Sequence, residues 1–368
     1  MRVLITGANG FIGTNAALAL SERQGWHISR FVRGDNSDCL SELVQNADAI
    51  LHLAGENRPV DPADFETGNV ALTRALCAAV AKAGRNIPIV AASSAQAVMD
   101  NDYGRSKLAG EKILEQYANQ SGNRVTVFRL PGVFGKWCRP DYNSVVATFC
   151  HNIARDMPIS ISNPDHLLHL VYVDDVIKCM ANALQNGDQG YTMENVNPVY
   201  NITLGALARQ IGDFEHCRAS LISEDVGTGF THALYATYIS YMPVEKFSYA
   251  VPRHGDERGV FVEMLKTKTA GQFSFFTAHP GITRGGHYHH SKTEKFLVIK
   301  GQALFKFRHM ISGERYEMET DGSKSEIVDT VPGWTHDITN IGTDEMIVML
   351  WANEIFDPEN PDTYSSKV

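Results

Sequence analysis

The sequence predicts two domains of different fold class, an α/β domain with a parallel sheet followed by an all-β domain. A chain of 368 residues is long enough for two domains. Up to about residue 190, short apolar runs alternate with helix-like segments, which is typical of a parallel sheet with helices on both faces. From about Phe247 onward the pattern has a period of two, which favours an antiparallel sandwich or small barrel. We expect the boundary within Tyr241–Lys246, giving domains 1–245 and 246–368.

The first domain is expected to follow the order that a parallel sheet requires. In chain order we expect strand Met1–Thr6, helix Phe11–Arg23, strands His27–Val32 and Asp48–Leu53, helix Asn69–Ala83, strand Ile87–Ala92, helix Tyr103–Gln120 and strand Val125–Leu130. We interpret the mixed stretch 191–245 as a substrate-side extension of this domain. In the second domain, the segment Ala303–Arg308 alternates cleanly, and glycine, proline and aspartate separate similar strands. We expect the tail after Asp357 to be mobile.

Composition excludes several classes of function. Lys and Arg number 33 against 42 Asp and Glu, a formal charge of −9 without a basic block, so a nucleic-acid or anionic-membrane partner is not expected. No apolar run approaches the ~20 residues that span a bilayer, and the first residues have the pattern of a strand rather than a signal peptide. All six cysteines precede residue 218 and lack metal-like spacing, which predicts reduced thiols in a cytoplasmic protein.

A glycine-rich turn follows the first strand and opens the first helix. Glycines at 7, 10 and 13 let the backbone approach a pyrophosphate, and the helix N-terminus supplies free N–H groups. The same spacing can serve tight strand–helix packing alone, but the strand context favours a Rossmann-type dinucleotide site. The candidate cofactor-binding residues of this turn are Gly7, Asn9, Gly10, Phe11, Ile12 and Gly13.

Two further strand ends bear on the cofactor. The second strand ends near Arg33, and an arginine at this place suits the 2′-phosphate of NADP, whereas an acidic residue would suit NAD. Arg33 can also be a solvated side chain, so NADPH is the preferred cofactor and NADH the alternative. Leu53, Ala54 and Gly55 end a later strand, where small residues let a cofactor lie across the edge of the sheet.

Tyr103 and Lys107 are the candidate catalytic pair. Their spacing of four places the phenol and the ammonium on one face of a helix. We expect Lys107 to lower the pKa of Tyr103 and make it a proton donor to a carbonyl during hydride transfer. Such pairs are also common on exposed helices. Here, however, the pair follows a buried strand that ends at Ser94, whose hydroxyl can orient the carbonyl.

These features together resemble the extended short-chain dehydrogenase/reductase family, which includes nucleotide-sugar epimerases, dehydratases and reductases. The matching residues are the glycine turn, His52–Gly55, Asn69, Ser94, Tyr103, Lys107, Arg129–Gly135 and Val173–Asp175. The resemblance implies that Ser94, Tyr103 and Lys107 form the catalytic triad and that Tyr103 and Lys107 also contact the cofactor. Asn69 and Asp174 are interpreted as structural. The usual Val-Tyr-Gly after the serine strand is here Ala97-Val98-Met99-Asp100, a departure in loop geometry.

The second domain contains four metal-ligand side chains at regular spacing. His287 and His289 alternate on one strand, Glu294 follows five residues later, and His336 lies on a later strand. Alternate strand residues point to the same side, so these donors can meet as three nitrogens and one carboxylate. Zinc is the first choice for this thiol-free set, and iron, manganese and nickel stay open. The alternative is that the histidines belong to the surface or the core.

The spacing of these donors resembles the cupin family over residues 250–355, which implies a jelly-roll-like fold. Segments 256–263 and 284–289 also resemble the deoxysugar 3,5-epimerases, cupins that act on nucleotide-linked keto sugars and generally need no metal. The epimerising base stays open among Tyr288, His290 and Asp337.

A short-chain reductase joined to an epimerase-like cupin is similar to the bifunctional enzymes of capsular-polysaccharide synthesis. That resemblance implies C3 epimerisation of a UDP-2-acetamido-2,6-dideoxy-4-hexulose, then NADPH-dependent reduction at C4. The product would be UDP-N-acetyl-6-deoxy-L-talosamine, a precursor of UDP-N-acetyl-L-fucosamine, and the enzyme a homodimer. Three alternatives remain: a 4-reductase with a structural or dimerising cupin, an epimerase or dehydratase with tightly held NAD⁺, and a redox sensor without turnover.

Overall fold

The structure of the protein is a computed structural model, and it describes residues 1–256, 259–262, 265–267, 271–354 and 359–368. The chain divides into two compact units, one of residues 1–144 and 167–202 and the other of residues 145–166 and 203–368. Two segments that precede residue 245 therefore belong to the compact unit that contains the β-domain. The predicted boundary near residue 245 describes a change of fold type rather than of compactness, and it stays a prediction.

The first unit is built on a parallel sheet. Its strands are β1 (Arg2–Thr6), β2 (His27–Phe31), β3 (Ala49–His52), β4 (Ile89–Ser94), β5 (Val125–Leu130) and β8 (Tyr191–Glu194). They pair in the order β2-β1-β3-β4-β5-β8, each pair parallel. The central residues of β1, Val3 to Ile5, are fully buried. The run is continuously apolar because helices cover both faces of such a sheet, and the predicted parallel α/β fold is confirmed.

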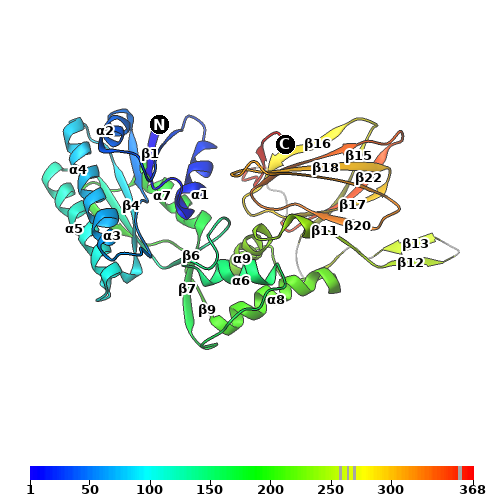
Figure 1. The fold of residues 1–368 in the computed structure, drawn as a ribbon. Coiled ribbons are helices and arrows are strands. Elements are labelled where there is room, and N and C mark those ends of the chain that lie inside the picture. Colours follow the sequence, from blue (N-terminus) through cyan, green and yellow to red (C-terminus); the bar gives the residue numbers. More distant parts are fainter. Residues whose placement is uncertain (257–258, 263–264, 268–270, 355–358) are drawn as a thin grey trace. The chain divides into compact units, whose positions relative to one another are not determined.

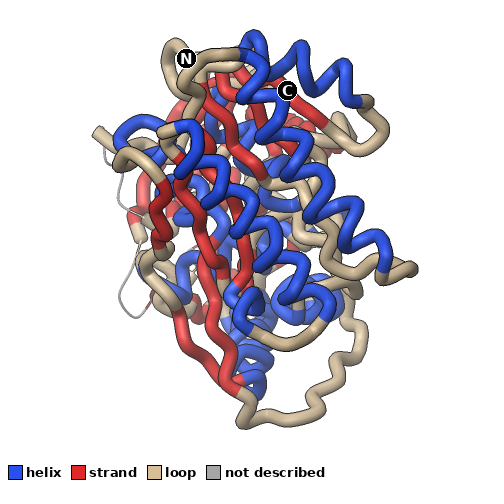
Figure 2. Tube along the Cα trace, turned by 90° about the vertical axis from the view of Figure 1, so that its left-hand side faces the viewer, coloured by secondary structure: helices blue, strands red, loops and turns tan. Residues whose placement is uncertain are grey.

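Helices cover this sheet on its two sides (Figure 1). They are α1 (Phe11–Ser21), α2 (Ser37–Asn46), α3 (Ala63–Phe65), the π-helix η1 (Glu66–Ala71), α4 (Leu72–Ala83), the 3₁₀ helix η2 (Ala95–Val98), α5 (Asp102–Ser121) and α7 (Val173–Asn186). Helices α2, α4 and α5 lie on one face, and α1 and α7 on the other. Figure 2 looks from the side of α4 and α5 and shows long helices running alongside the strands. Ile50 of β3, Leu76 of α4 and Leu114 of α5 belong to one buried hydrophobic cluster. A smaller sheet joins β6 (Gly132–Phe134), β7 (Leu167–Tyr172) and β9 (Tyr200–Thr203).

The second unit combines helices with two antiparallel sheets. Its helices are α6 (Val145–Ile153), α8 (Leu204–Ser220), α9 (Gly229–Ser240) and the 3₁₀ helix η3 (Val244–Lys246).

One sheet of this unit has the order β11-β20-β17-β22-β15, with β11 (Ser248–Ala250), β20 (Glu326–Asp329), β17 (Glu294–Lys300), β22 (Met346–Ala352) and β15 (Gln272–Ala278). The other has the order β19-β18-β21-β16-β23, with β19 (Arg315–Asp321), β18 (Gln302–His309), β21 (Trp334–Asn340), β16 (Thr283–Tyr288) and β23 (Tyr364–Ser365). Short strands β10 (Ile222–Ser223) and β14 (Lys266–Thr267) pair, as do β12 (Arg253–Asp256) and β13 (Gly259–Val262).

The two larger sheets enclose the core of the β-domain. Along β18, Ala303, Phe305 and Phe307 are buried and alternate with less buried residues, as a half-buried strand requires. The ring of Phe305 lies 5.8 Å from that of Phe296 on β17 of the other sheet, measured between centroids. The predicted all-β, jelly-roll-like domain is confirmed. Among the helices of the described residues, none is long and apolar enough to cross a bilayer.

The end of the chain is part of this β-domain. Strand β23 pairs antiparallel with β16, placing Ser365 opposite His287 and Tyr364 opposite Tyr288. The expectation of a mobile tail is therefore not met at these residues. Periodicity did not predict this strand because it is two residues long and its position is set by its partner.

Candidate active sites

The glycine turn between β1 and α1 leaves no room for side chains. Gly7 has a φ of +68°, and a Cβ built on it would lie 2.6 Å from the Cα atom of Ala54, two residues after β3. A Cβ on Gly13 would lie 2.1 Å from the carbonyl oxygen of Gly7. Gly10 precedes the first turn of α1 without a side-chain cap. The first N–H groups of α1 therefore lie beside a bare backbone turn, which suits an anionic ligand.

Asn69 fixes the loop that follows β3. Its Oδ1 accepts a hydrogen bond from the backbone N–H of Glu56 at 2.9 Å. Its Nδ2 donates to the carbonyl of Glu56 at 3.1 Å and to Ser106 Oγ, on α5, at 2.9 Å. A Cβ on Gly55 would lie 2.6 Å from Lys107 Nζ and 2.7 Å from Asn69 Oδ1. Gly55 thus lets the loop after β3 approach Lys107 closely, and Asn69, in the π-helical turn η1, has the structural role that was predicted.

Arg33 lies after β2 and forms an ion pair with Glu56. The Arg33 side chain is 84% exposed, whereas that of Glu56 is 20% exposed. Sequence reasoning named Arg33 but missed Glu56, because the two come from different strand ends and share no motif. A 2′-phosphate at this place would have to compete with the Glu56 carboxylate for the guanidinium group.

The predicted triad lies where the C-terminal end of β4 meets the start of α5, and it consists of Ser94, Tyr103 and Lys107. Asn101 caps α5 by accepting a hydrogen bond from the N–H of Gly104 at 2.7 Å, which places Tyr103 in the first turn. The Lys107 ammonium lies 5.7 Å from the centroid of the Tyr103 ring. Ser94 is the last residue of β4. The Tyr103 hydroxyl donates a hydrogen bond to Asn57 Oδ1 at 3.1 Å, a partner that no sequence pattern indicated.

The electrostatics of this pair differ from the expectation in one respect. Burial raises the pKa of Tyr103, and hydrogen bonding with Ser94 only partly opposes this. We expected Lys107 to lower the pKa of Tyr103. The loss of solvent around the phenol outweighs this effect, and the Lys107 ammonium lies over the face of the ring. Burial lowers the pKa of Lys107 to about 8, although Glu111 opposes the shift.

Glu111 is a buried carboxylate one turn beyond Lys107 that sequence reasoning missed. Arg129 holds it with two hydrogen bonds, Nε to Oε1 at 2.9 Å and Nη2 to Oε2 at 2.6 Å. The Ser93 hydroxyl donates to the same carboxylate at 2.5 Å. Lys107, Glu111 and Ser93 line one pocket. The bidentate pair accounts for the position of Arg129, the penultimate residue of β5, beside Glu111.

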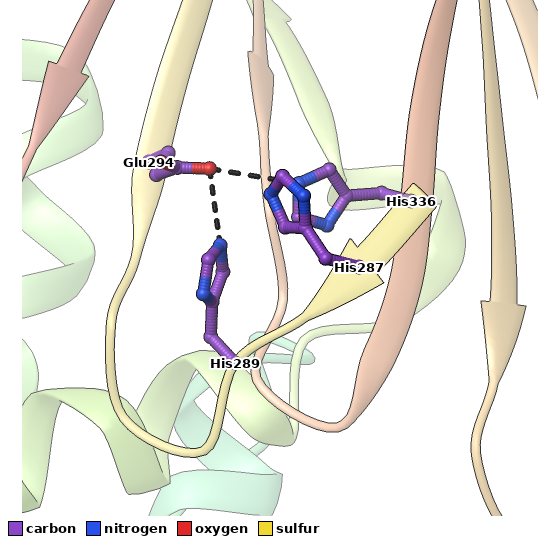
Figure 3. Close-up of side chains that lie close together, drawn as sticks. All are labelled: His287, His289, Glu294 and His336. Carbon is purple, nitrogen blue, oxygen red and sulfur yellow. Dashed lines mark hydrogen bonds and ion pairs between the residues drawn. The ribbon is translucent and has the colours of Figure 1, made fainter. Parts of the chain in front are cut away.

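The four predicted metal ligands converge in the β-domain (Figure 3). His287 lies near the end of β16 and His289 just after it, Glu294 opens β17, and His336 is on β21. Their ligand atoms all lie within 4.8 Å of one another. Glu294 Oε2 lies 3.2 Å from His289 Nε2 and 3.5 Å from His336 Nε2.

This arrangement fits a divalent metal ion. Both ring nitrogens of His336 are buried without a well-formed hydrogen bond to any of the described residues, an arrangement that costs about 1–3 kcal/mol when nothing compensates it. Burial and the neighbouring histidines lower the pKa of His287 to about 4, and burial also lowers the pKa of His336. Burial opposes ionisation of Glu294, but the close approach of His289 and His336 holds its pKa well below the usual value. Neutral imidazoles beside a carboxylate are the forms that bind zinc-like metals.

The metal-type cluster opens into a pocket with a cavity volume of about 180 Å³. Aromatic side chains line one part of it, and Arg284 and Asp337 add charged groups next to His287. Among the three candidate bases, Asp337 lines this pocket, whereas Tyr288 is 3% exposed and stacks on Tyr364. The His290 ring also packs against Tyr364. Asp337 Oδ1 is buried without a hydrogen-bond partner among the described residues. The epimerase-like segment 256–263 includes residues outside the described ones.

The fold and the sites define an enzyme-like chain of two parts, a dinucleotide-type α/β unit and a cupin-type β-domain with a metal-ligand cluster. Known proteins agree with this description. The NAD dependent epimerase/dehydratase family matches residues 3–202, and the polysaccharide biosynthesis C-terminal domain matches residues 254–364. The chain therefore belongs to the NAD dependent epimerase/dehydratase family, in a form that carries the polysaccharide biosynthesis C-terminal domain.

Individual relatives extend over the whole chain. A UDP-2-acetamido-2,6-beta-L-arabino-hexul-4-ose reductase of Pseudomonas aeruginosa is 56% identical over 368 residues, covering 100% of this chain and 99% of the relative. The crystal structure of the capsular polysaccharide assembling protein CapF from Staphylococcus aureus is 40% identical, with full coverage of both chains and a TM-score of 0.69. UDP-glucuronate 4-epimerase 1 of Arabidopsis thaliana is 27% identical over 239 residues, 50% of this chain and 55% of that protein. The resemblance to the enzymes of capsular-polysaccharide synthesis that the sequence predicted is confirmed by this match to CapF.

Proposed function

We propose that the protein is a bifunctional nucleotide-sugar enzyme that inverts C3 of a UDP-2-acetamido-2,6-dideoxy-4-hexulose and then reduces its C4 ketone with NADPH. Residues 1–245 would carry the reductase and residues 246–368 the epimerase. The observation that carries the proposal is the presence of two separate reactive clusters, Tyr103 with Lys107 and His287 with Glu294 and His336. The printed name of the P. aeruginosa relative, a hexul-4-ose reductase, supports a C4 ketone as the group on which both clusters act.

The reductive half uses Tyr103 as the proton donor. Bound NADPH would supply the hydride to C4. The Tyr103 hydroxyl, held near Asn57 and Ser94, would give its proton to the carbonyl oxygen and so form the C4 hydroxyl. Lys107, beside the phenol, would stabilise the negative charge that remains on Tyr103 until a solvent proton replaces it.

The epimerising half needs a base next to the metal-type cluster. A C4 ketone acidifies the proton on C3, so a carboxylate in the pocket can remove it and water or a second acid can return a proton on the opposite face. Among the candidates from the sequence, Asp337 meets the positional requirement because it lines the pocket with His287. A divalent metal, with zinc as the first choice, would act as a Lewis acid toward the negative charge that develops on the sugar. His287, His289, Glu294 and His336 would hold it.

Epimerisation must come before reduction, because reduction removes the ketone that acidifies C3. The product would be UDP-N-acetyl-6-deoxy-L-talosamine, a precursor of UDP-N-acetyl-L-fucosamine for capsular or O-antigen polysaccharide. The resemblance to the bifunctional capsular enzymes also supports a cytoplasmic enzyme that forms a homodimer. Light scattering of the purified protein would test the dimer.

The test separates the two half-reactions. Purified, metal-loaded protein is incubated in deuterated water with the UDP-linked 4-keto-6-deoxy-N-acetylhexosamine, first without NADPH. We expect deuterium to enter C3, read by NMR, and one equivalent of NADPH to be consumed when it is then added. Absence of exchange together with NADPH consumption and unchanged C3 would leave a 4-reductase with a structural cupin. Exchange without net NADPH consumption would leave an epimerase.

Arg33→Ala is expected to raise the KM for NADPH about 10- to 100-fold and leave the KM for NADH nearly unchanged. The reason is that a hydrogen bond to a charged group contributes about 1.5–3 kcal/mol and each 1.4 kcal/mol is tenfold in binding. Steady-state kinetics with both cofactors measures the two values. Arg30→Ala is the control: Arg30 is an exposed arginine on β2, three residues before Arg33, and its substitution should change neither KM value. An unchanged ratio of the two KM values in the Arg33 variant would contradict the proposed contact.

A further inference from the structure

The last described residues of the chain lie against β16, the strand that carries His287 and leads directly to His289. Strand β23 places Ser365 opposite His287, and the N–H of Ser366 donates to the carbonyl of Gly286 at 2.8 Å. In Figure 1 the C-terminus lies next to β16. The chain end is thus an outer strand of the sheet that holds His287 and His336.

Asp362, just before β23, caps the loop that leads from β16 to β17. Its Oδ1 accepts a hydrogen bond from the backbone N–H of His290 at 2.8 Å. Its Oδ2 accepts from the N–H groups of Ser291 and Lys292, each at 2.7 Å, and from the Ser291 hydroxyl at 2.9 Å. One carboxylate therefore fixes three consecutive peptide units between His289 and Glu294. Hydrogen bonds to a carboxylate are among the strong ones.

The main chain of Asp362 also meets the ring of His289. Its carbonyl oxygen is hydrogen-bonded to His289 Nδ1. A carbonyl oxygen can only accept, so Nδ1 carries a proton. Nε2 lies 3.2 Å from Glu294 Oε2 and is the nitrogen that faces the cluster; a bound metal would take the place of the proton that Nε2 shares with this carboxylate. Contacts of this kind fix the tautomer and orientation of metal-binding histidines.

The same loop reaches the carboxylate ligand through Lys292. The Lys292 ammonium lies 3.0 Å from Glu294 Oε1, whereas Oε2 faces the histidines. The N–H of Lys292 is one of the three that Asp362 holds. Asp362 therefore positions two ligands. It contacts His289 directly, and it holds Lys292, which in turn contacts Glu294.

We propose that Asp362 is a positioning residue for the metal site, and that the end of the chain serves to present His289 Nε2 and Glu294 Oε2 to the ion. The inference rests on the proposed function in one respect, that the cluster binds a divalent metal. It adds a residue 26 positions beyond the last ligand by sequence, 362 against 336.

The test is a cobalt titration of the full-length protein, wild type and variants, against a competing chelator. Asp362→Ala and the isosteric Asp362→Asn are expected to weaken Co²⁺ binding about 10- to 100-fold, the usual effect of losing such an outer contact. They should also shift the visible absorption bands of bound Co²⁺, which a change in folding stability alone would not do. Asp321→Ala is the matched control, since Asp321 caps a turn at Ser323 with the same kind of carboxylate contacts away from the cluster. It should bind like the wild type.

A second measurement needs no variant. In zinc-loaded protein with ¹⁵N-labelled histidine, NMR should find the proton of His289 on Nδ1 and the metal on Nε2. A proton on Nε2 would overturn the inference, and so would wild-type affinity and unchanged cobalt bands in Asp362→Asn.

The outcome also separates this inference from the proposed function. If the wild type binds cobalt and the Asp362 variants lose it, but C3 exchange is absent, the epimerase proposal falls and the role of Asp362 stands. If exchange occurs and the variants bind normally, only the role of Asp362 falls. If the wild type binds neither cobalt nor zinc, both fall.

Discussion

Tyr103→Phe is expected to lower the kcat of C4 reduction by about 10²- to 10⁴-fold, the usual contribution of a positioned proton donor. The substitution removes the hydroxyl that donates to Asn57 and leaves the ring, which packs 5.9 Å from Phe65 between centroids and lies beside the Lys107 ammonium. Cofactor binding and deuterium exchange at C3 should therefore survive, because neither uses the phenol proton. The rate of NADPH oxidation and the NMR exchange assay measure the two activities separately.

Tyr117→Phe supplies the matched control for this result. Tyr117 lies on the same helix, is 9% exposed, and its hydroxyl accepts a hydrogen bond from Asn123 at 2.8 Å. Its loss removes a hydroxyl from α5 without touching the predicted triad, and the rate should stay within about threefold of the wild type if Tyr103 acts through its proton. A Tyr103→Phe enzyme that reduces the ketone at a comparable rate would remove Tyr103 from the mechanism.

His287→Ala is expected to abolish stoichiometric metal binding and C3 exchange. It removes one of four donors that lie within 4.8 Å of one another, and the affinity should fall by more than the ~100-fold that outer contacts contribute. The reductase should still bind NADPH, because its cofactor turn lies in the other compact unit. Metal content by mass spectrometry and the deuterium assay without NADPH measure the effect.

His279→Ala is the control for this variant. His279 follows β15, is exposed, and does not belong to the ligand cluster. It should keep both metal and exchange. If His287→Ala lost its metal but still inverted C3, the ion would have a structural rather than a catalytic role, and the epimerisation would depend on Asp337 and other pocket residues alone.

Much of the fold and of both clusters could be predicted because their signals are local or strictly spaced. The glycine turn needs close backbone approach between Gly7 and Ala54, and only glycine fits there, so the requirement is visible in the residues themselves. Tyr103 and Lys107 share a helix face, and His287 and His289 are two residues apart at the end of one strand. Periodicities of this kind place side chains before any tertiary contact is known.

The missed residues have no such signal. Glu56 forms an ion pair with Arg33, which follows a different strand. Asn57 accepts a hydrogen bond from Tyr103, 46 positions away in the sequence. Glu111 of α5 forms an ion pair with Arg129 of β5. Each is an ordinary polar residue whose role exists only because another segment approaches it. Burial has the same origin: the pKa of Tyr103 is raised because its surroundings exclude water, which the Tyr–Lys spacing alone could not indicate.

By itself, the sequence determined the two fold classes. It also predicted the candidate catalytic and cofactor residues of the first part and the four donors of the second, because backbone geometry converts spacing directly into direction. Tertiary structure alone decided which segments pack into each compact unit, that Asp337 rather than Tyr288 or His290 faces the pocket, and that Asp362 holds the loop between the ligands. These depend on contacts between distant segments, and such contacts are set by packing and solvent exclusion over the whole unit rather than by local pattern.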